Sequence, residues 1–175
     1  MSLELGPCQV LFGTAGAEAD LGKTEGGVII NFGTDVVDLT SDQYGTAPEE
    51  QVITGQKATI VIPLADITLD NLAIALNQTK LAKLNKYGIP GTNIVGTALK
   101  DTKAQSLLLK KYVSGAVSTD TEDWIRFAKA APVSTFDYPF SKTDQRIIEV
   151  TFTAFPDDDD NLYYIGDETA ASEGS

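Results

Sequence analysis

The fold is decided near the C-terminal end of the chain, by the stretch Arg146-Ile147-Ile148-Glu149-Val150-Thr151-Phe152-Thr153-Ala154-Phe155. Every second residue in it is apolar and belongs to one face, namely Ile148, Val150, Phe152 and Ala154. Successive side chains of a β-strand point to opposite faces, so this alternation is typical of a strand with one buried face. The stretch therefore predicts a strand that ends at Pro156.

Shorter stretches of similar character precede it. Strands are predicted over residues 8–12, 28–32, 36–40, 51–54, 57–63, 105–113 and 124–130. Gly33-Thr34-Asp35 is expected to break the chain between two of them, and Gly55 indicates a turn or bulge between two others. Residues 124–130 fit a strand or a helix, and the Pro132-Val133 pair that follows favours a strand. Residues 13–27 are predicted to form a long loop.

One segment follows the helical period instead. Residues three and four apart share its apolar face, namely Leu69, Leu72, Ala73 and Leu76. Thr68 is the expected N-cap, and Asp70 is placed favourably in the first turn. The predicted helix runs to about Leu84, and the glycines and proline of residues 85–96 indicate a loop after it.

Many short strands, one amphipathic helix and no alternation of strand and helix predict a mainly β protein. We expect an antiparallel β-sandwich or barrel with one flanking amphipathic α-helix. Residues 1–175 are predicted to form a single domain. Outside its core we expect an N-terminal arm at about 1–7, an extended loop at about 33–50 and an acidic C-terminal arm at about 156–175, which holds seven acids and no base.

The composition makes catalysis and nucleic-acid binding improbable. The 175 residues include no histidine, one cysteine (Cys8), 25 acids and 13 bases, which gives a net charge of −12. Histidine is the side chain whose charge ordinarily changes near neutral pH, and it is the commonest metal ligand. A single cysteine forms no internal disulfide, and scattered bases do not grip a phosphate backbone. No apolar stretch approaches the roughly 20 residues of a membrane helix, and the first residues do not resemble a signal peptide.

Apparent chemical motifs have simpler interpretations. Gly16 to Thr24 resembles a phosphate-binding loop, but five residues separate its glycines instead of four, and two acids lie where phosphate would bind. The run Asp157–Asp160 with Asn161 is better explained as a solvated turn than as a calcium site. Cys8 is expected to be a small buried hydrophobe, and Trp124 and Phe127 to be core residues. We expect no catalytic residue, no cofactor and no metal.

The order of several segments along the chain carries a resemblance. Gly26-Gly27-Val28 leads into Asp42-Gln43-Tyr44-Gly45-Thr46-Ala47-Pro48; Thr54-Gly55 and a strand then end in Pro63-Leu64-Ala65-Asp66-Ile67-Thr68-Leu69-Asp70-Asn71-Leu72. Later come Phe127-Ala128-Lys129-Ala130-Ala131-Pro132 and a strand closed by Pro156-Asp157. This layout, from about residue 8 to 167, resembles the tail tube (major tail) proteins of long-tailed bacteriophages.

The resemblance implies a structural virion protein with no enzymatic activity. Its subunits would form hexameric rings that stack into a hollow tail tube, a conduit for DNA ejection into the host. A polar loop would reach the neighbouring ring, and by position it would include Asp35, Asp38, Asp42, Gln43, Tyr44, Gly45, Thr46, Glu49 and Glu50.

The implied partners are other copies of the chain, the tape measure, terminator and tip proteins of the tail, and double-stranded DNA in passive transit, with no membrane. The implied location is the virion tail, after synthesis in the cytoplasm of the bacterial host. An acidic lumen would keep DNA phosphates off its wall.

Three alternatives stay open on the sequence. One is a tail terminator or the tube subunit of a contractile injection system. Another is a monomeric β-sandwich that binds a ligand such as a carbohydrate through Trp124, or through Tyr163 and Tyr164. The third is an enzyme that uses carboxylates alone.

Overall fold

The computed structural model describes residues 7–40, 47, 49–66, 68–75, 79–81, 86–88, 98–133 and 147–166. The strands of its main antiparallel sheet are β1 (Cys8–Thr14), β2 (Ala17–Asp20), β3 (Ile29–Leu39), β4 (Glu50–Leu64), β7 (Gln105–Val113), β9 (Trp124–Pro132) and β10 (Ile148–Phe155), with the short β8 (Ala116–Val117) and β11 (Tyr164–Ile165) at its margins. A separate hairpin joins β5 (Thr79–Leu81) and β6 (Lys86–Gly88). The helices are α1 (Leu69–Ala75), α2 (Leu99–Thr102) and the 3₁₀ turn η1 (Thr121–Asp123). None of the described helices is long and apolar enough to cross a membrane.

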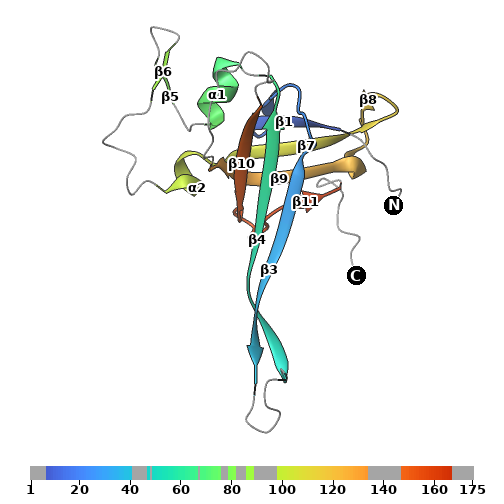
Figure 1. Ribbon diagram of the computed structural model, residues 1–175, viewed down its shortest axis with the longest axis vertical. Coiled ribbons are helices and arrows are strands. Elements are labelled where there is room, and N and C mark those ends of the chain that lie inside the picture. Colours follow the sequence, from blue (N-terminus) through green and yellow to red (C-terminus); the bar gives the residue numbers. More distant parts are fainter. Residues whose placement is uncertain are drawn as a thin grey trace.

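The main sheet is bent into two layers, which confirms the prediction of a mainly β, antiparallel, sandwich-like fold. Its strand order is β2-β1-β7-β9-β10-β4-β3. In Figure 1, β1, β7 and β9 run across the direction of β10, β4 and β3. The bend lies between β9 and β10, where Phe152 pairs with Pro132 and Phe155 with Lys129.

The core lies between the two layers, and alternation along each strand builds it. From β4 and β10 come the fully or almost fully buried residues Ala58, Ile60, Ile62, Leu64, Ile148, Val150 and Phe152. The opposite layer contributes Val10, Phe12, Leu107, Leu109 and Phe127. The rings of Phe12 and Phe152 meet across the layers with centroids 4.9 Å apart. The predicted inward face of residues 146–155 is confirmed.

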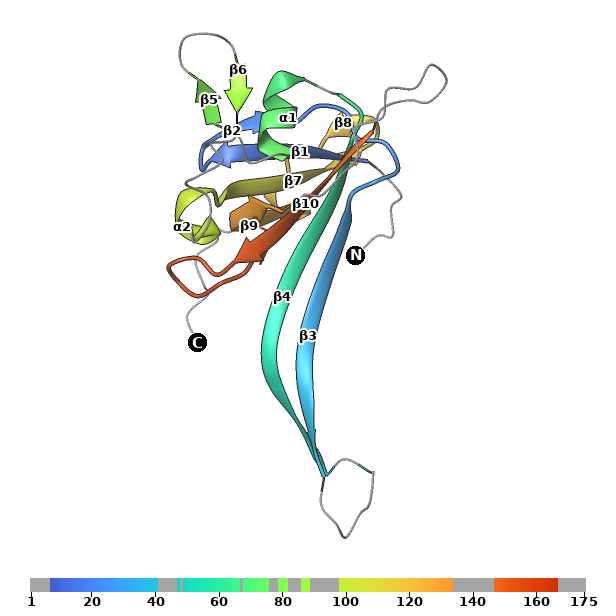
Figure 2. The same ribbon diagram turned by 60° about the vertical axis from the view of Figure 1, so that its left-hand side comes forward.

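A set of hydrogen bonds, called the latch below, joins the two layers at the end of the body that carries α1 (Figure 2). The segment after β2 bonds to the end of β4 through Ala65 N–H to the Lys23 carbonyl (2.8 Å) and Glu25 N–H to the Pro63 carbonyl (3.1 Å). The Asp66 carboxylate accepts from the Lys23 amide at 3.0 Å. The latch therefore fixes where β4 ends and α1 begins.

Helix α1 is held to this latch by one buried amide. The Asn71 side chain, 6% exposed, donates to the carbonyls of Leu21 and Asp66, both at 2.8 Å. The Thr68 hydroxyl accepts from the Asn71 backbone amide at 3.1 Å, which confirms Thr68 as the N-cap.

The predicted length of this helix is wrong. It ends at Ala75, not near Leu84, and Thr79–Leu81 is strand β5. The β5–β6 pairing takes the backbone hydrogen bonds that a longer helix would have used, so a local helical period is overridden here. The loop expected over residues 85–96 begins as strand β6, and residues 89–96 lie outside the described part of the chain.

The first strands differ from expectation in a similar way. Residues 13–27, predicted as a loop, contain β2, which pairs with β1 around a tight turn at Ala15-Gly16. The edge strand β2 is held to the sheet by a residue far away in the sequence: the Glu18 carboxylate accepts a hydrogen bond from Arg126 of β9 at 3.0 Å. Arg126 also donates to Ser106 of β7 at 3.2 Å. Burial opposes ionisation of the Glu18 carboxyl, but its hydrogen bonds and the Arg126 charge outweigh burial and lower its pKa.

An acidic C-terminal arm was predicted over residues 156–175, but residues 156–166 do not form an arm. They turn back onto the sheet, where Tyr164 pairs with Arg126 and Ile165 with Ile125. The remaining residues of that prediction, 167–175, and residues 1–6 of the predicted N-terminal arm lie outside the described part of the chain.

The latch requires a glycine at position 22. Gly22 has φ +86°, and a Cβ there would lie 2.7 Å from an Asp66 Oδ and 3.0 Å from the Asp66 Cβ. Gly16 has a similar φ of +81°, but a Cβ there would meet nothing within 4 Å.

Gly22→Ala is therefore expected to destabilise the protein more than Gly16→Ala. Each substitution carries a backbone strain of roughly 1–2 kcal/mol, and only Gly22→Ala also displaces Asp66 from the latch. Urea unfolding of both variants and the parent measures the difference in the free energy of unfolding. Equal losses in the two variants would contradict the role of the latch.

Candidate interaction surface

The clearest functional feature is a two-stranded arm, formed by Phe32–Leu39 of β3 and Glu50–Lys57 of β4. Figure 2 shows the two strands leaving the body together and continuing well beyond it. Of the large apolar side chains that the structure describes as exposed, seven lie on this hairpin or at its base: Ile29, Phe32, Val36, Val37, Leu39, Val52 and Ile53. Among them, Phe32 packs on Tyr163 of the body.

Adjacent apolar pairs place these side chains on both faces of the arm, and a bulge decides which of them share a face. The register shifts so that Asp35 pairs with Gly55 and Val36 pairs with Ile53, which leaves Thr54 as the extra residue. Val36 and Ile53 therefore share one face, and Val37 and Val52 share the other. The predicted bulge at Gly55 is confirmed, but the two predicted strand pieces form one continuous strand.

The extended loop predicted over residues 33–50 is wrong for most of its described length. Residues 33–39 belong to β3, and Glu50 begins β4 and pairs with Leu39. The expected break at Gly33-Thr34-Asp35 is absent because these residues pair with Gly55, Gln56 and Lys57. Paired β-branched side chains on each side of the bulge favour a continuous ribbon over a loop.

The acidic residues predicted for this region have specific places. Asp35 forms an exposed ion pair with Lys57 at 3.0 Å, and Asp38 accepts from the Gln51 side chain at 2.8 Å. The Glu49 amide donates to the Leu39 carbonyl at 2.7 Å. Asp42, Gln43, Tyr44, Gly45 and Thr46 lie outside the described residues. Exposed ion pairs contribute little stability, about 0–1 kcal/mol.

A groove of about 710 Å³ lies where the arm leaves the body. One wall is the β4 segment Ile53–Lys57, and the other is formed by Pro156 and the segment Asp160–Tyr163. The Tyr163 ring packs on Phe32 of the arm, with centroids 4.6 Å apart, and lies 6.1 Å from Phe127 of the core. Tyr163 thereby connects the arm to the body beside the groove.

The second wall of the groove is held by one carboxylate. Asp157 accepts from the amides of Asp159 and Asn161, both at 2.9 Å, and from the Tyr164 hydroxyl at 2.5 Å. The Tyr164 hydrogen bond is the main reason that the pKa of Asp157 is lowered. The same contact raises the pKa of Tyr164. Asp157 thus turns inward as a structural acceptor, as predicted for a turn.

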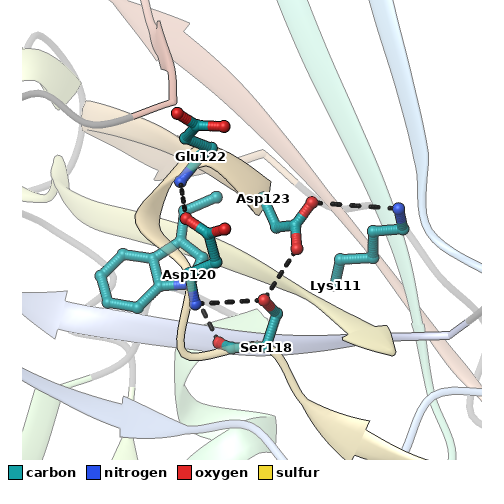
Figure 3. Close-up of polar contacts among 6 residues, drawn as sticks. Lys111, Ser118, Asp120, Glu122 and Asp123 are labelled. Atoms are coloured by element: carbon teal, nitrogen blue, oxygen red, sulfur yellow. Dashed lines mark hydrogen bonds and ion pairs between the residues drawn. The ribbon is translucent and has the colours of Figure 1, made fainter. Parts of the chain in front are cut away.

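The polar cluster in Figure 3 also has a structural role. Ser118 donates to Asp123 at 2.8 Å and accepts from the Asp120 amide at 3.2 Å, while Asp120 accepts from the Glu122 amide at 3.1 Å. Lys111 lies 3.9 Å from Asp123. These contacts cap η1 and order the turn before β9. Among the described residues, no three His, Cys, Asp or Glu side chains are grouped as a metal site requires.

Residues considered for nucleophilic or ligand-binding chemistry are tied into the fold. Cys8 is partly buried beside an apolar recess of about 200 Å³, and burial raises the pKa of its thiol, which disfavours the reactive thiolate. The Trp124 indole donates to the Ser118 carbonyl at 3.1 Å and has the Lys110 ammonium 3.9 Å from its ring centre. Phe127 is fully buried, as predicted.

No protein-family model matches the sequence, and no curated protein matches it.

The apolar character of the arm was missed by sequence reasoning. The signal was present in the adjacent pairs Val36-Val37 and Val52-Ile53. Neighbouring residues of a strand point to opposite faces, so an apolar pair indicates a strand with two apolar faces.

Tyr164→Phe is expected to raise the pKa of Asp157 toward its ordinary value, because it removes the main hydrogen bond to the ionised carboxylate. A lowered native pKa stabilises the fold above the unfolded-state pKa, and this contribution is lost as the pH falls through the native pKa. NMR titration of the Asp157 carboxyl measures the shift. Tyr163→Phe is the matched control and should leave that titration unchanged; an unmoved Asp157 in Tyr164→Phe would refute the assignment.

Proposed function

We propose that this protein is a non-catalytic structural subunit that assembles with copies of itself as the tail tube of a long-tailed bacteriophage. In this function, hexameric rings stack into a tube that conducts DNA into the host. The observation that carries the proposal is the β3–β4 arm, which exposes large apolar side chains on both faces. The segment order given above supplies the link to the tail tube family.

The energetics of the arm favour a partner. Burying one large aliphatic side chain stabilises a complex by about 1.5–3 kcal/mol, and contiguous exposed apolar surface on soluble proteins marks interaction sites. Because Val36 and Ile53 lie on one face and Val37 and Val52 on the other, one flat partner surface would cover only half of them. A stacked assembly supports burial of both faces, since each arm lies between neighbouring subunits.

The sheet also has an open edge that self-assembly would complete. β3 is the last strand in the sheet order, and it extends for eleven residues. Long apolar edge strands invite pairing with another chain. A contact between two different surfaces of identical subunits repeats from copy to copy and closes into a ring when the rotation permits.

The charge is compatible with passage of DNA. A net charge of −12 opposes binding of the phosphate backbone, and repulsion between free subunits favours solubility before assembly. In the proposed assembly, the tape measure, terminator and tip proteins of the tail are the other partners.

The monomeric ligand-binding alternative has less support. A carbohydrate platform needs exposed aromatic rings. Of the three residues predicted for it, Trp124 is held by Ser118 and Lys110, and the Tyr164 hydroxyl is bound to Asp157. Tyr163 is 38% exposed and packs on Phe32. A tail terminator or the tube of a contractile injection system would share the arm and the fold. Electron microscopy separates the terminator, because it remains a single ring.

Ile53→Lys is expected to abolish assembly, because it places a charge on the apolar arm. Ile165→Lys is the matched control: Ile165 is 60% exposed and Ile53 62%, but Ile165 lies on β11, which pairs with β9 of the body. Negative-stain microscopy and sedimentation of concentrated protein should show tubes for the parent and Ile165→Lys, and monomers for Ile53→Lys. Circular dichroism checks that each variant is folded. A parent protein that stays monomeric at high concentration would overturn the proposed function.

A further inference from the structure

Strand β4 has a partner on only one side over much of the arm. On the body, β10 pairs with it from Ile148↔Leu64 to Thr153↔Thr59. Beyond Thr59, β3 continues to pair with β4 as far as Glu50, and no described strand pairs with the other edge. The backbone N–H and C=O groups of that edge are available for an added strand.

The groove at the base of the arm lies along this same edge. Its β4 wall is Ile53–Lys57, which lies just before Thr59, the first residue of β4 that pairs with β10. Its far wall, Asp160–Tyr163, is held in place by the Asp157 turn and by the packing of Tyr163 on Phe32. A strand entering here would pair with β4 in the position that β10 occupies on the body. This is strand addition at a preformed edge.

Among the described strands, β2 and β3 are the two ends of the main-sheet order and offer free edges as donors. β2 is four residues long and charged, and Glu18 and Asp20 on it are engaged by Arg126 and Gln9. Short charged edges are protected against pairing. β3 is eleven residues long, and its distal part carries the exposed Val36, Val37 and Leu39. Of the two, β3 is the suitable donor.

We propose that the groove receives the distal part of β3, Thr34–Leu39, from a second copy of the chain. The added strand would hydrogen-bond to the β4 edge and bury apolar side chains of both arms. This inference rests on the proposed self-assembly, and it names the surfaces that meet. Charge does not favour the contact, because Lys57 in the groove is already paired with Asp35 of its own chain, and Asp160 opposes the donor's Asp35 and Asp38. The hydrogen bonds and apolar burial therefore carry the contact.

Donor and groove are different surfaces, so the contact is head to tail, and mixed cysteine variants can detect it. In a Cys8→Ser background, one protein carries Gln56→Cys in the groove. A second protein carries Val36→Cys or Val37→Cys. These two donor positions point to opposite faces of the strand, so for each orientation of the added strand one of the two lies on the side of Gln56→Cys. After co-assembly and mild oxidation, a disulfide between the two proteins is expected, because bridging needs Cα atoms within about 7 Å.

The matched control donor is Ala19→Cys, on the other free edge, β2. Non-reducing electrophoresis and mass spectrometry of the linked peptides should show a mixed disulfide for a β3 donor and not for Ala19→Cys. Tubes or rings that form without a β3-to-groove disulfide would overturn this inference and leave the proposed function standing. A Gln56-to-Gln56 disulfide alone would also overturn it, because that contact is symmetric. Absence of any assembly would overturn both.

Discussion

The structure depends on the burial of one face of strand β4, beside its neighbour β10, against the opposite layer. Ala58, Ile60, Ile62 and Leu64 point inward at alternate positions and are at most 1% exposed. This half of the strand is anchored by the main core, so its direction is fixed. The other half, from Glu50 to Lys57, continues along that direction without a core of its own. The arm is thus the extension of a core strand, and the fold determines where it projects.

The bulge at Thr54 changes what this extension presents. In an uninterrupted strand, Val52 would lie on the same face as Ala58 and Ile60. The extra residue shifts the parity, so that Ile53 continues the inward face and Val52 lies on the outer one. The bulge therefore matches Ile53 with Val36 on one face and Val52 with Val37 on the other, and the groove beside Tyr163 lies along the free edge of β4. The single inserted residue therefore decides which apolar side chains share each face of the arm.

At the opposite end of the body, the fold is stabilised by the closely packed polar side chains of Asn71 and Asp66. Asn71 satisfies two buried carbonyls, and Asp66 occupies the space that a side chain at position 22 would need. Leaving buried carbonyls unpaired costs about 1–3 kcal/mol each. The latch holds the two layers together where the segment between β2 and β3 meets the end of β4. The arm and the latch thus lie at opposite ends of one rigid strand.

Local pattern in the sequence determined the fold class: residues 146–155 alternate, as a strand with one buried face must, and the Pro132-Val133 pair after residues 124–130 favours a strand there. It also determined the cap at Thr68 and the bulge beside Gly55, which depend on a few adjacent residues. Tertiary structure alone decided that residues 33–35 join the strands predicted over 28–32 and 36–40, that the helix stops at Ala75, and that residues 156–166 return to the sheet. Each of these outcomes depends on a partner distant in the sequence, and local periodicity holds no information about such partners. The same reason explains the candidate site. Its apolar pairs are visible in the sequence, but the groove forms only where β4 extends beyond its pairing with β10.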